Sequence, residues 1–461
     1  MRLSSSFRDP SGFMFRADGS LLRYVSLLYK DNYDKLLSSG LYEKLEAANL
    51  LISHQDVTKK HGKVDNRCYK ILRPELVPFI SYPYEWSFSQ LKDAALTTLK
   101  IQKLALEHGM ILKDASAYNI QFYGGEPLLI DTLSFDVYKE GQAWLAYQQF
   151  CHHFMGPLAL AAYVDIRLLK LLRDYVDGIP LDLVSKLLPV KTRFKPQLYM
   201  HLHLHAKSQK KHAGRQKKVS ATLSLKALNN LVDSLELVIK SLKWQPSGTQ
   251  WADYYEDTNY SQTAFKSKLK IVEELISLSK PSVMWDMGAN IGEFSRLASN
   301  KDVFTIAFDT DPAAVEKNYL QVKKNSESNL LPLTLDLANP SPPIGWANQE
   351  RMSLSDRGSP DLVMALALIH HLAISNNVPL ADIAKFFAGL TKHLIIEFVP
   401  KEDSQVKRLL LNRKNIFSNY SQKEFEKVFA NYYKVVKSAK VSGSQRTIYL
   451  MKNLINLRNI D

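Results

Sequence analysis

The chain has little cysteine: only Cys68 and Cys151 occur among 461 residues. Two cysteines cannot build a disulfide framework or a cysteine-ligated zinc site, and such low usage is typical of a reducing compartment. Residues 1–12 lack the apolar core of a signal peptide, and no apolar run reaches the length needed to cross a membrane. We therefore expect a cytoplasmic protein without a membrane span.

Acidic residues are missing from one long stretch. Residues 186–218 hold ten Lys and Arg but no Asp or Glu, in a chain whose net charge is +14. This composition predicts a basic connector, which could attract RNA or an acidic protein surface. Nucleic-acid binding is not favoured, because only Phe194 and Tyr199 are available there to stack on bases. A non-catalytic module that docks an acidic partner through this linker is one alternative function.

Three histidines alternate within the same stretch, at positions 201, 203 and 205. Residues spaced by two share one side of a strand, so a metal site is conceivable there. A surface strand or solvated connector explains the pattern without a metal, and we expect none. The length predicts two to four domains. We place an α+β domain at 1–188, a basic linker and helix at 189–250, and a third domain at 251–461; the oligomeric state is not encoded in any motif.

The first domain begins with a predicted hairpin, in which Phe13–Phe15 and Leu21–Leu27 flank a turn. We expect a helix over Leu36–Ile52, a strand over Val77–Tyr82 and a long amphipathic helix over Phe88–His108. Gly109 ends that helix.

The next stretch carries three polar residues at informative positions. Asp114 is followed five residues later by Asn119, then by two β-like runs around Gly124-Gly125, and then by Asp131. This order resembles the catalytic segment of the protein-kinase-like fold, including small-molecule phosphotransferases. The resemblance implies that Asp114 orients an acceptor hydroxyl, that Asn119 and Asp131 hold magnesium, and that ATP is bound.

This segment also departs from the kinase pattern. Leu112-Lys113 replaces the expected His-Arg pair, and Thr132-Leu133 follows the last Asp in place of Phe-Gly. Residues 1–80 contain no glycine-rich phosphate loop and no clear strand lysine. A helix, loop and hairpin whose acids merely cap turns is therefore an open alternative.

The most informative stretch is 282–297, SVMWDMGANIGEFSRL. A short apolar run reads as a buried strand, ends at Asp286, passes through a turn and enters a helix predicted over Glu293–Ala298. Such strand–turn–helix units bind nucleotides, because glycines let the backbone approach the ligand. The turn differs from the dinucleotide pattern by placing an acid at the strand end. That acid repels a pyrophosphate but suits a ligand that carries an ammonium group.

Acids also end the next two predicted strands. Val303–Phe308 leads to Asp309, which lies 23 residues after Asp286, near the spacing at which a carboxylate reaches a ribose. Leu330–Leu335 leads to Asp336. Further strands are predicted at 361–368 and 393–398, followed by a terminal antiparallel pair at 434–438 and 447–451.

This order of five strands with helices and a final antiparallel pair resembles the class I S-adenosylmethionine-dependent methyltransferases, over residues 251–456. The resemblance implies a Rossmann-like α/β domain with a mostly parallel seven-stranded sheet. It also implies S-adenosylmethionine as cofactor, with the methionine moiety, ribose and adenine held by Asp286, Gly288, Asn290, Gly292, Asp309 and Asp336. More narrowly, the segments ALALIHHLAISNNVPL and EFVPKEDSQV are similar to bacterial nodulation-protein-like methyltransferases.

The fourth strand ends at His370 and His371, where such enzymes face the transferable methyl. A neutral imidazole can accept a proton from a hydroxyl or amine that attacks the methyl. The alternative is that these histidines pack in the core. Glu397 and Lys401, after the fifth strand, are expected to line the acceptor pocket.

We therefore predict methyl transfer to an unidentified oxygen or nitrogen acceptor, with the N-terminal domain recognising the substrate. A kinase-like phosphotransferase or ATP-binding N-terminal domain is the alternative.

Overall fold

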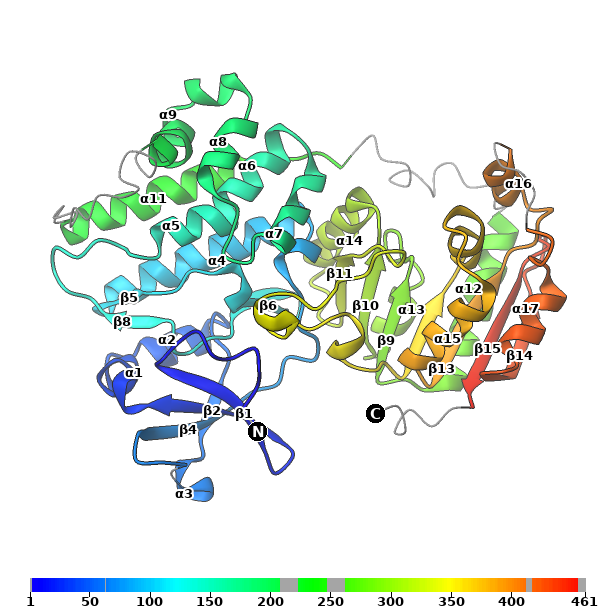
Figure 1. Cartoon of the computed structure of the whole chain (residues 1–461), viewed down its shortest axis with the longest axis horizontal. Helices are drawn as coiled ribbons and strands as arrows, with labels where there is room; N and C mark the ends of the chain where they lie inside the picture. Colours follow the sequence, from blue (N-terminus) through cyan, green and yellow to red (C-terminus); the bar gives the residue numbers. More distant parts are fainter. Residues whose placement is uncertain (1, 63, 208–222, 247–261, 412–416, 455–461) are drawn as a thin grey trace. The chain divides into compact units, whose positions relative to one another are not determined.

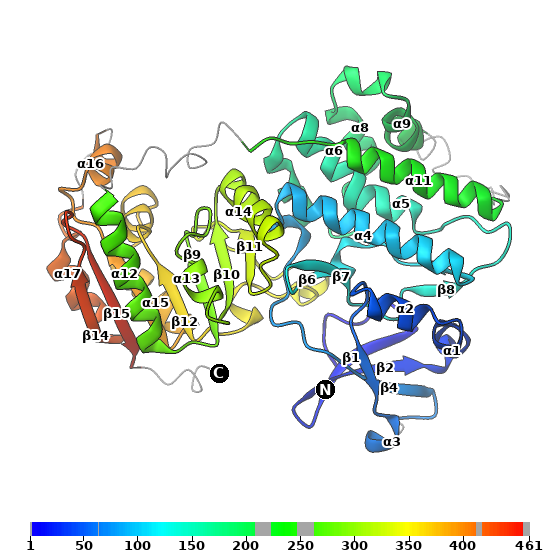
Figure 2. The same cartoon turned by 180° about the vertical axis from the view of Figure 1, so that it is seen from behind.

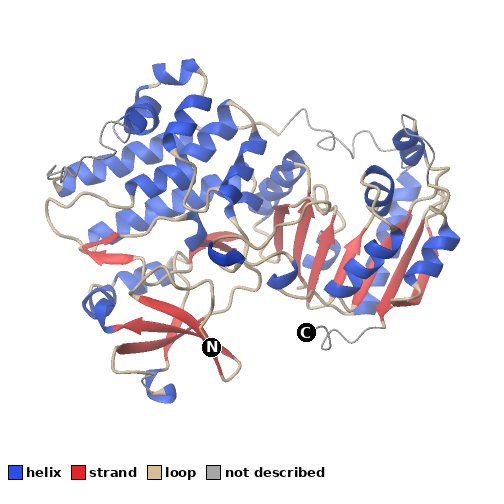
Figure 3. Cartoon of the chain, in the orientation of Figure 1, coloured by secondary structure: helices blue, strands red, loops and turns tan. Residues whose placement is uncertain are grey.

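The computed structural model describes residues 2–62, 64–207, 223–246, 262–411 and 417–454. The chain forms two compact units (Figures 1 and 3). Unit 1 comprises residues 1–245 together with 343–352, and unit 2 comprises residues 246–342 together with 353–461. Among the described residues, no helix has the length and apolar character needed to cross a membrane.

Unit 1 begins with a four-stranded antiparallel sheet in the order β1-β2-β4-β3. Its strands are β1 (Gly12–Ala17), β2 (Ser20–Ser26), β3 (His54–Asp56) and β4 (Cys68–Pro74). The predicted hairpin is confirmed. The single helix predicted over 36–52 is wrong, because Gly40 adopts a φ of 76° between α1 (Lys30–Ser38) and α2 (Leu41–Ala47). The strand predicted over Val77–Tyr82 is also wrong, since those residues form an irregular connection.

The helical part of unit 1 is built on α4 (Phe88–Glu107), as its amphipathic pattern predicts. Ser87 and Gln90 cap its N-terminus reciprocally, which satisfies two backbone donors that would otherwise be unpaired. Helix α11 (Leu225–Ser241) lies alongside it (Figures 1 and 2), and Lys103 of α4 pairs with Asp233 of α11 at 2.6 Å. Other α-helices in the described part of unit 1 are α3 (Thr58–His61), α5 (Tyr147–Phe150), α6 (Gly156–Tyr163), α7 (Leu171–Asp174), α8 (Leu181–Leu187) and α9 (Pro196–Leu198).

The described part of the basic stretch is largely helical, whereas we expected a solvated connector or a surface strand. Its lysines and arginines are exposed, but two of its histidines are buried. His201 and His203 lie in a π-helical turn, Tyr199–Leu204, and are 0% and 2% exposed. The His201 ring contacts the hydroxyls of Tyr147 at 2.8 Å and Ser234 at 3.0 Å. These two histidines are therefore buried residues of the core of unit 1. Within the described ranges no group of three His, Cys, Asp or Glu side chains is placed to hold a metal ion, and residues 208–218 fall outside those ranges.

Two small antiparallel pairs bring the kinase-like segment together. Strand β5 (Met110–Leu112) pairs with β8 (Phe135–Val137), and β6 (Ile120–Tyr123) forms a hairpin with β7 (Glu126–Leu129). The hairpin of β6 and β7 lies between β5 and β8 in the sequence. Because β5 and β8 pair, the loop after β5 and the loop before β8 lie close together.

Unit 2 contains a seven-stranded sheet in the order β11-β10-β9-β12-β13-β15-β14. The first five strands in this order are parallel, and β15 and β14 join in antiparallel fashion. The α/β class and the terminal antiparallel pair are confirmed. The strands are β9 (Val283–Met287), β10 (Phe304–Asp309), β11 (Leu330–Thr334), β12 (Leu362–Ala365), β13 (His393–Phe398), β14 (Tyr433–Lys440) and β15 (Thr447–Asn453).

Helices cover both faces of this sheet. Helix α12 (Gln262–Ser279) lies in front of it in Figure 2, whereas α15 (Leu380–Leu390) and α17 (Gln422–Phe429) lie in front of it in Figure 1. Central strands are apolar on both sides, as a doubly covered parallel sheet requires. The other helices are α13 (Arg296–Ser299), α14 (Pro312–Asn325) and α16 (Ser404–Leu410). Helix α13 begins three residues later than the predicted start at Glu293.

One segment of unit 1 comes from far along the chain. Residues 343–352, here called the arm, lie in the sequence between β11 and β12 but belong to unit 1. Glu350 is 1% exposed and accepts hydrogen bonds from the Arg8 guanidinium, one of them at 3.0 Å, and from the Trp346 backbone at 3.1 Å. The Met352 N–H donates to the Tyr82 hydroxyl at 2.7 Å. The arm is thus a folded part of unit 1.

Candidate functional site

The glycine turn after β9 has the backbone geometry that a close ligand needs. Gly288 is exposed and has a φ of 87°, a conformation that L side chains rarely adopt. Asn290, at a φ of 50°, also lies in the left-handed region, where Asn is tolerated better than most residues. Gly292 has a φ of 83°, and a Cβ there would lie 2.6 Å from Asn318 Nδ2. The turn therefore accepts side chains poorly at both glycines.

Asp286 lies within β9, just before the turn, and is 2% exposed. Its Oδ2 accepts a 2.6 Å hydrogen bond from the Ser295 hydroxyl. Burial raises the pKa of Asp286 to about 7, and the nearby charge of Asp309 adds to that increase. The carboxyl is thus held in a place where a cationic ligand group would favour its ionised form.

Asp309 ends β10 and joins the second strand to the glycine turn. Its Oδ2 accepts the Asn290 N–H at 2.7 Å, and its Oδ1 accepts the Asp311 N–H at 2.9 Å. Burial raises the pKa of Asp309 to about 6, although these backbone donors oppose the increase. Each carboxylate oxygen keeps accepting capacity, so the group can still receive hydroxyl donors.

Asp336 follows β11 and is half-buried. Its carboxylate accepts the Ala338 N–H at 2.9 Å, and the Leu335 N–H donates to the Asp309 carbonyl at 2.8 Å. Asp286 is the penultimate residue of β9, Asp309 ends β10 and Asp336 follows β11, so all three lie at the ends of neighbouring parallel strands. The carboxyl ends of such strands meet at one edge of the sheet, so the fold brings these three predicted acids together.

The two histidines follow β12, at the next strand along the same edge. Their rings lie 4.2 Å apart between centroids. His370 is 2% exposed, whereas His371 is half-buried and begins a π-helical turn, His371–Ser375. Burial, with a contribution from Arg446, lowers the pKa of His371 to about 4, and burial, with a contribution from His371, holds the pKa of His370 well below its ordinary value. Both imidazoles are therefore neutral at neutral pH, and His371 is the more accessible.

Glu397 does not line an open pocket, which corrects our expectation. It is 0% exposed and forms a 2.7 Å ion pair with Lys268 of α12. Lys401 donates to the Phe417 carbonyl. The sequence analysis did not identify Lys268 as a residue of this region, although its position on a helix is informative. It lies four residues from Ala264 and four from Val272 on the buried face of α12, where an unpaired lysine would be costly.

In unit 1 the three kinase-like residues lie in one hydrogen-bonded cluster. Ser134 donates to Asp131 at 2.6 Å and receives a weak contact from the Asn119 amide at 3.4 Å. The Asp114 carboxylate accepts the Ser116 N–H at 2.9 Å. Burial raises the pKa of Asp114, and the charge of Asp131 adds to this increase. Asp114 also receives a side-chain hydrogen bond from Asn119, so Asp114, Asn119 and Asp131 lie near one another in unit 1.

Arg23 of β2 was not predicted, and it forms an ion pair with Asp131. Burial opposes ionisation of Asp131, but the Arg23 charge and the Ser134 hydroxyl lower its pKa overall. The sequence search for a strand lysine could not find this residue, because the strand cation is an arginine. Asp131 is thus already neutralised by a side chain of unit 1.

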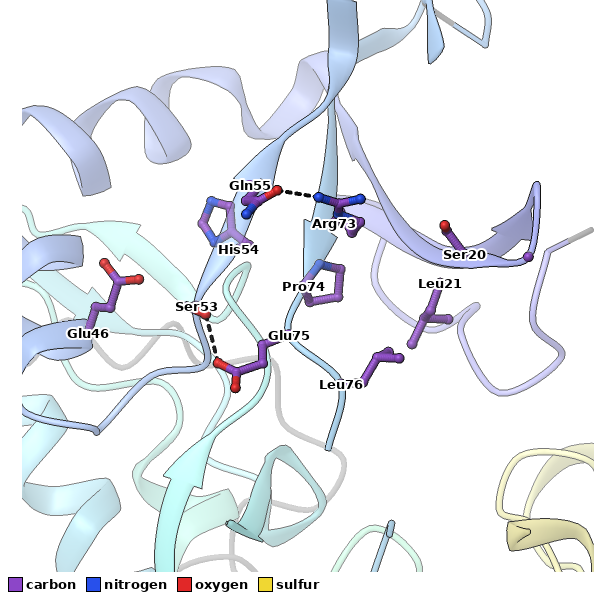
Figure 4. A pocket seen from close by; sticks show the side chains of 11 residues that line it. Ser20, Leu21, Glu46, Ser53, His54, Gln55, Arg73, Pro74, Glu75 and Leu76 are labelled. Carbon is purple, nitrogen blue, oxygen red and sulfur yellow. Dashed lines mark hydrogen bonds between the residues drawn. The ribbon is translucent and has the colours of Figure 1, made fainter. Parts of the chain in front are cut away.

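Unit 1 also contains a cavity of about 540 Å³ beside the ends of β3 and β4 (Figure 4). Its polar lining groups largely bind one another: Ser53 donates to Glu75 at 2.9 Å, and Arg73 donates to Gln55. Asp114, Asn119 and Asp131 do not line it. We therefore assign no ligand to this cavity.

The strand order of unit 2, its glycine turn and the acids at the edge of the sheet define a fold. Unit 2 has the fold of the class I S-adenosylmethionine-dependent methyltransferases. No protein-family model matches the sequence. The chain is 36% identical over 456 residues to nodulation protein NoeA of Rhizobium meliloti (strain 1021), a match that covers 97% of this chain and 95% of that relative. The chain therefore belongs to the family of nodulation protein NoeA.

Among solved structures, the chain is similar to N-methyltransferase NodS from Bradyrhizobium japonicum WM9 with S-adenosyl-L-homocysteine. That likeness has a TM-score of 0.31 at 12% identity and covers 45% of this chain and 94% of NodS. Magnesium protoporphyrin IX methyltransferase from Synechocystis PCC 6803 gives 0.31 at 15% identity, with 44% and 93% covered. WbdD bound to a kinase inhibitor gives 0.31 at 15%, with 44% and 43% covered. At these scores the fold assignment rests on the strand order.

Proposed function

We propose that unit 2 transfers a methyl group from S-adenosylmethionine to an oxygen or nitrogen acceptor. The observation that supports this most directly is the shared carboxylate of Asp309, which the glycine turn and β10 hold jointly. When bound, S-adenosylmethionine supplies an electrophilic methyl group. The residues of the chain would then bind the donor, orient it and receive the proton of the acceptor.

The site residues fit that cofactor chemically. Asp309 offers two oxygens to a ribose diol, which is a bidentate donor. Asp286 is a buried carboxyl whose ionised form an ammonium group would stabilise. Gly288 leaves the turn open, since the atom nearest to the position of a Cβ on this residue is Leu368 Cδ1, at 3.6 Å. We assign Asn290 and Gly292 to the backbone cradle and Asp336 to the adenine amino group.

We further propose His371 as the proton acceptor, with His370 packed behind it. Both rings are neutral near pH 7, because burial lowers their pKa values. His371 is the better placed of the two, because His370 is 2% exposed. Its neutral imidazole has a nitrogen electron pair that can accept the proton released as the new bond to the methyl group forms. Unit 1 would recognise the acceptor.

Calorimetry with S-adenosylhomocysteine on the full chain tests the donor site. We expect the parent protein and the Asp382→Asn variant, which alters an exposed acid of α15, to bind equally. The Asp309→Asn variant should bind at least about tenfold more weakly, because it loses a charged acceptor. Failure of the parent to bind, or equal binding by Asp309→Asn, would contradict the proposal.

A second candidate function is phosphoryl transfer or nucleotide binding by unit 1. It is favoured by the convergence of Asp114, Asn119 and Asp131 with a strand cation, Arg23. In kinases a strand lysine contacts the nucleotide phosphates; Arg23 carries the same charge but is paired with Asp131, so it would have to release that carboxylate when magnesium and ATP bind. Titration of ATP with magnesium should show binding that weakens in Asp131→Asn but not in Asp177→Asn. Binding that persists in Asp131→Asn would count against this candidate.

A further inference from the structure

Four charged side chains are buried together in unit 2. Lys268, Glu397 and Arg446 are 3%, 0% and 4% exposed, and the Asp403 side chain is 13% exposed. The Arg446 guanidinium donates two hydrogen bonds to the Asp403 carboxylate, from Nε at 2.7 Å and from Nη2 at 3.1 Å. Its Nη1 lies 3.7 Å from Glu397 Oε1. We call these four residues the buried quartet.

Glu397 joins this quartet to the backbone after β12. Its Oε2 accepts a 2.7 Å bond from Lys268 Nζ and a second 2.7 Å bond from the Ala367 N–H. Ala367 has a φ of 48°, in the left-handed region that a residue with a Cβ rarely occupies. The surroundings must therefore hold Ala367 in place, and Glu397 is the group that contacts its N–H.

The position of Ala367 sets the course of the backbone through residues 368–371. Leu368 lies against the glycine turn, with Cδ1 3.6 Å from the place of a Cβ on Gly288. The Leu368 carbonyl accepts the His371 N–H at 3.0 Å and thereby starts the histidine turn. A shift at Ala367 would move both the wall beside Gly288 and the imidazole of His371.

Lys268 contacts the other side of the same region. Its Nζ lies 4.9 Å from the ring centroid of Phe294, two residues after Gly292. One ammonium group thus lies between the glycine turn and the loop after β12. A buried ion pair is rarely more stabilising than an apolar pair of similar size, so stability alone gives little reason for it.

We propose that Glu397, held by Lys268, is a positioning residue that fixes the backbone of Ala367 and so shapes the S-adenosylmethionine site. The quartet acts through Leu368 and His371 and does not touch the ligand. This inference rests on the proposed function of unit 2, because it concerns the shape of that cofactor site.

Two double variants of the full chain distinguish two roles for Glu397: positioning the Ala367 backbone, and only supplying a charge to the buried ion pair. Lys268→Met with Glu397→Gln removes both charges but keeps an amide oxygen for the Ala367 N–H. Lys268→Met with Glu397→Leu removes both charges and that oxygen. Binding of S-adenosylhomocysteine is measured by calorimetry, and hydrogen exchange is measured on a peptide spanning residues 366–372.

We expect the Gln pair to keep the parent affinity and exchange protection. The Leu pair should bind about tenfold more weakly and exchange faster, because a backbone donor is left unpaired. Equal behaviour of the two pairs would overturn the proposal. Should the Leu pair fail to melt cooperatively, the Glu397→Asp variant, which withdraws the oxygen by one methylene, should show the same loss.

The exchange measurement also separates this proposal from the proposed function. If the parent does not bind S-adenosylhomocysteine, the proposed function fails, yet the exchange contrast between the Gln and Leu pairs still tests whether Glu397 holds Ala367. If the parent binds and the two pairs exchange alike, only the positioning role fails.

Discussion

The backbone N–H of Asn290 lies 2.7 Å from Oδ2 of Asp309, so the glycine turn after β9 and the end of β10 share one carboxylate. Because the donor is a backbone group, its direction depends on the conformation of Asn290 and not on the Asn290 side chain. The carboxylate orientation is therefore coupled to a residue in the left-handed region, with a φ of 50°.

This coupling predicts opposite results for two substitutions at position 290. Asn290→Gly should retain S-adenosylhomocysteine binding, because glycine adopts this conformation without strain. Asn290→Val should lower the free energy of unfolding by about 1–2 kcal/mol, because a β-branched residue is strained there, and should weaken binding. Thermal melting and calorimetry on both variants check this, and a Val variant that binds like the Gly variant would contradict it.

The raised pKa values of Asp286 and Asp309 predict how binding depends on pH. Both groups keep their protons up to about pH 7 and 6, respectively, whereas a diol and an ammonium group prefer the ionised carboxylates. Affinity for S-adenosylhomocysteine should therefore rise between about pH 5 and 8. Calorimetry across this range on the parent and on Asp286→Asn should show a flatter profile in the variant. An equally steep rise in both would exclude Asp286 as the titrating group.

The same two groups predict the pH dependence of stability without ligand. Their folded pKa values lie above the ordinary value of 3.8, so the unfolded chain releases protons first. Their contribution to stability is present below about pH 4 and is lost as the pH rises to about 7. At about pH 8, Asp286→Asn should melt at a higher temperature than the parent, and the difference should shrink at about pH 4. The opposite trend would contradict the assigned direction of the shift.

Gly292 should be intolerant of a methyl group. Gly292→Ala would place Cβ 2.6 Å from Asn318 Nδ2 and 2.7 Å from Arg296 Nη1, at a φ of 83°. We expect a loss of about 1–3 kcal/mol in the free energy of unfolding. Gly389 in α15 is the matched control, because no atom lies within 4 Å of a Cβ there. Gly389→Ala should be neutral or stabilising by up to about 1 kcal/mol in thermal unfolding.

The arm should depend on its one buried acid. Glu350→Gln removes the charge that faces Arg8, and we expect unit 1 to lose about 2 kcal/mol of stability, because the polar groups around position 350 are left imperfectly paired. Asp177→Asn alters the other partner of Arg8, whose side chain is 84% exposed, and should change stability by less than about 0.5 kcal/mol. Hydrogen exchange on residues 343–352 reports the result, and equal exchange in both variants would contradict it.

Much of unit 2 could be predicted because its signals are local. The apolar runs that end at Asp286, Asp309 and Asp336 identify parallel strands, and their order identifies the sheet. Lys268 shows the limit of this approach: its partner Glu397 lies 129 positions away, and only the packing of α12 on the sheet brings them together. The expectation that Glu397 faces a pocket failed for the same reason, since strand-end residues can point into the core.

Unit 1 was predicted less completely. Gly40 divides a stretch whose apolar periodicity favours one long helix, so turn chemistry outweighed the pattern there. The run Val77–Tyr82 has strand-forming residues but no partner strand, and β propensity is realised only through pairing. Arg23 could not be matched to Asp131 from the sequence, because the two residues lie 108 positions apart.

The arm has a consequence for synthesis on the ribosome. Unit 1 is interrupted after residue 245 and is completed by residues 343–352, so its last element emerges 107 residues later (352 − 245). At ordinary translation speeds this interval lasts roughly 5–20 s, during which Arg8 has no Glu350 to bind. Unit 1 is therefore complete only after residues 246–342 of unit 2 have been made, and a single cut at residue 245 separates its larger segment from the arm.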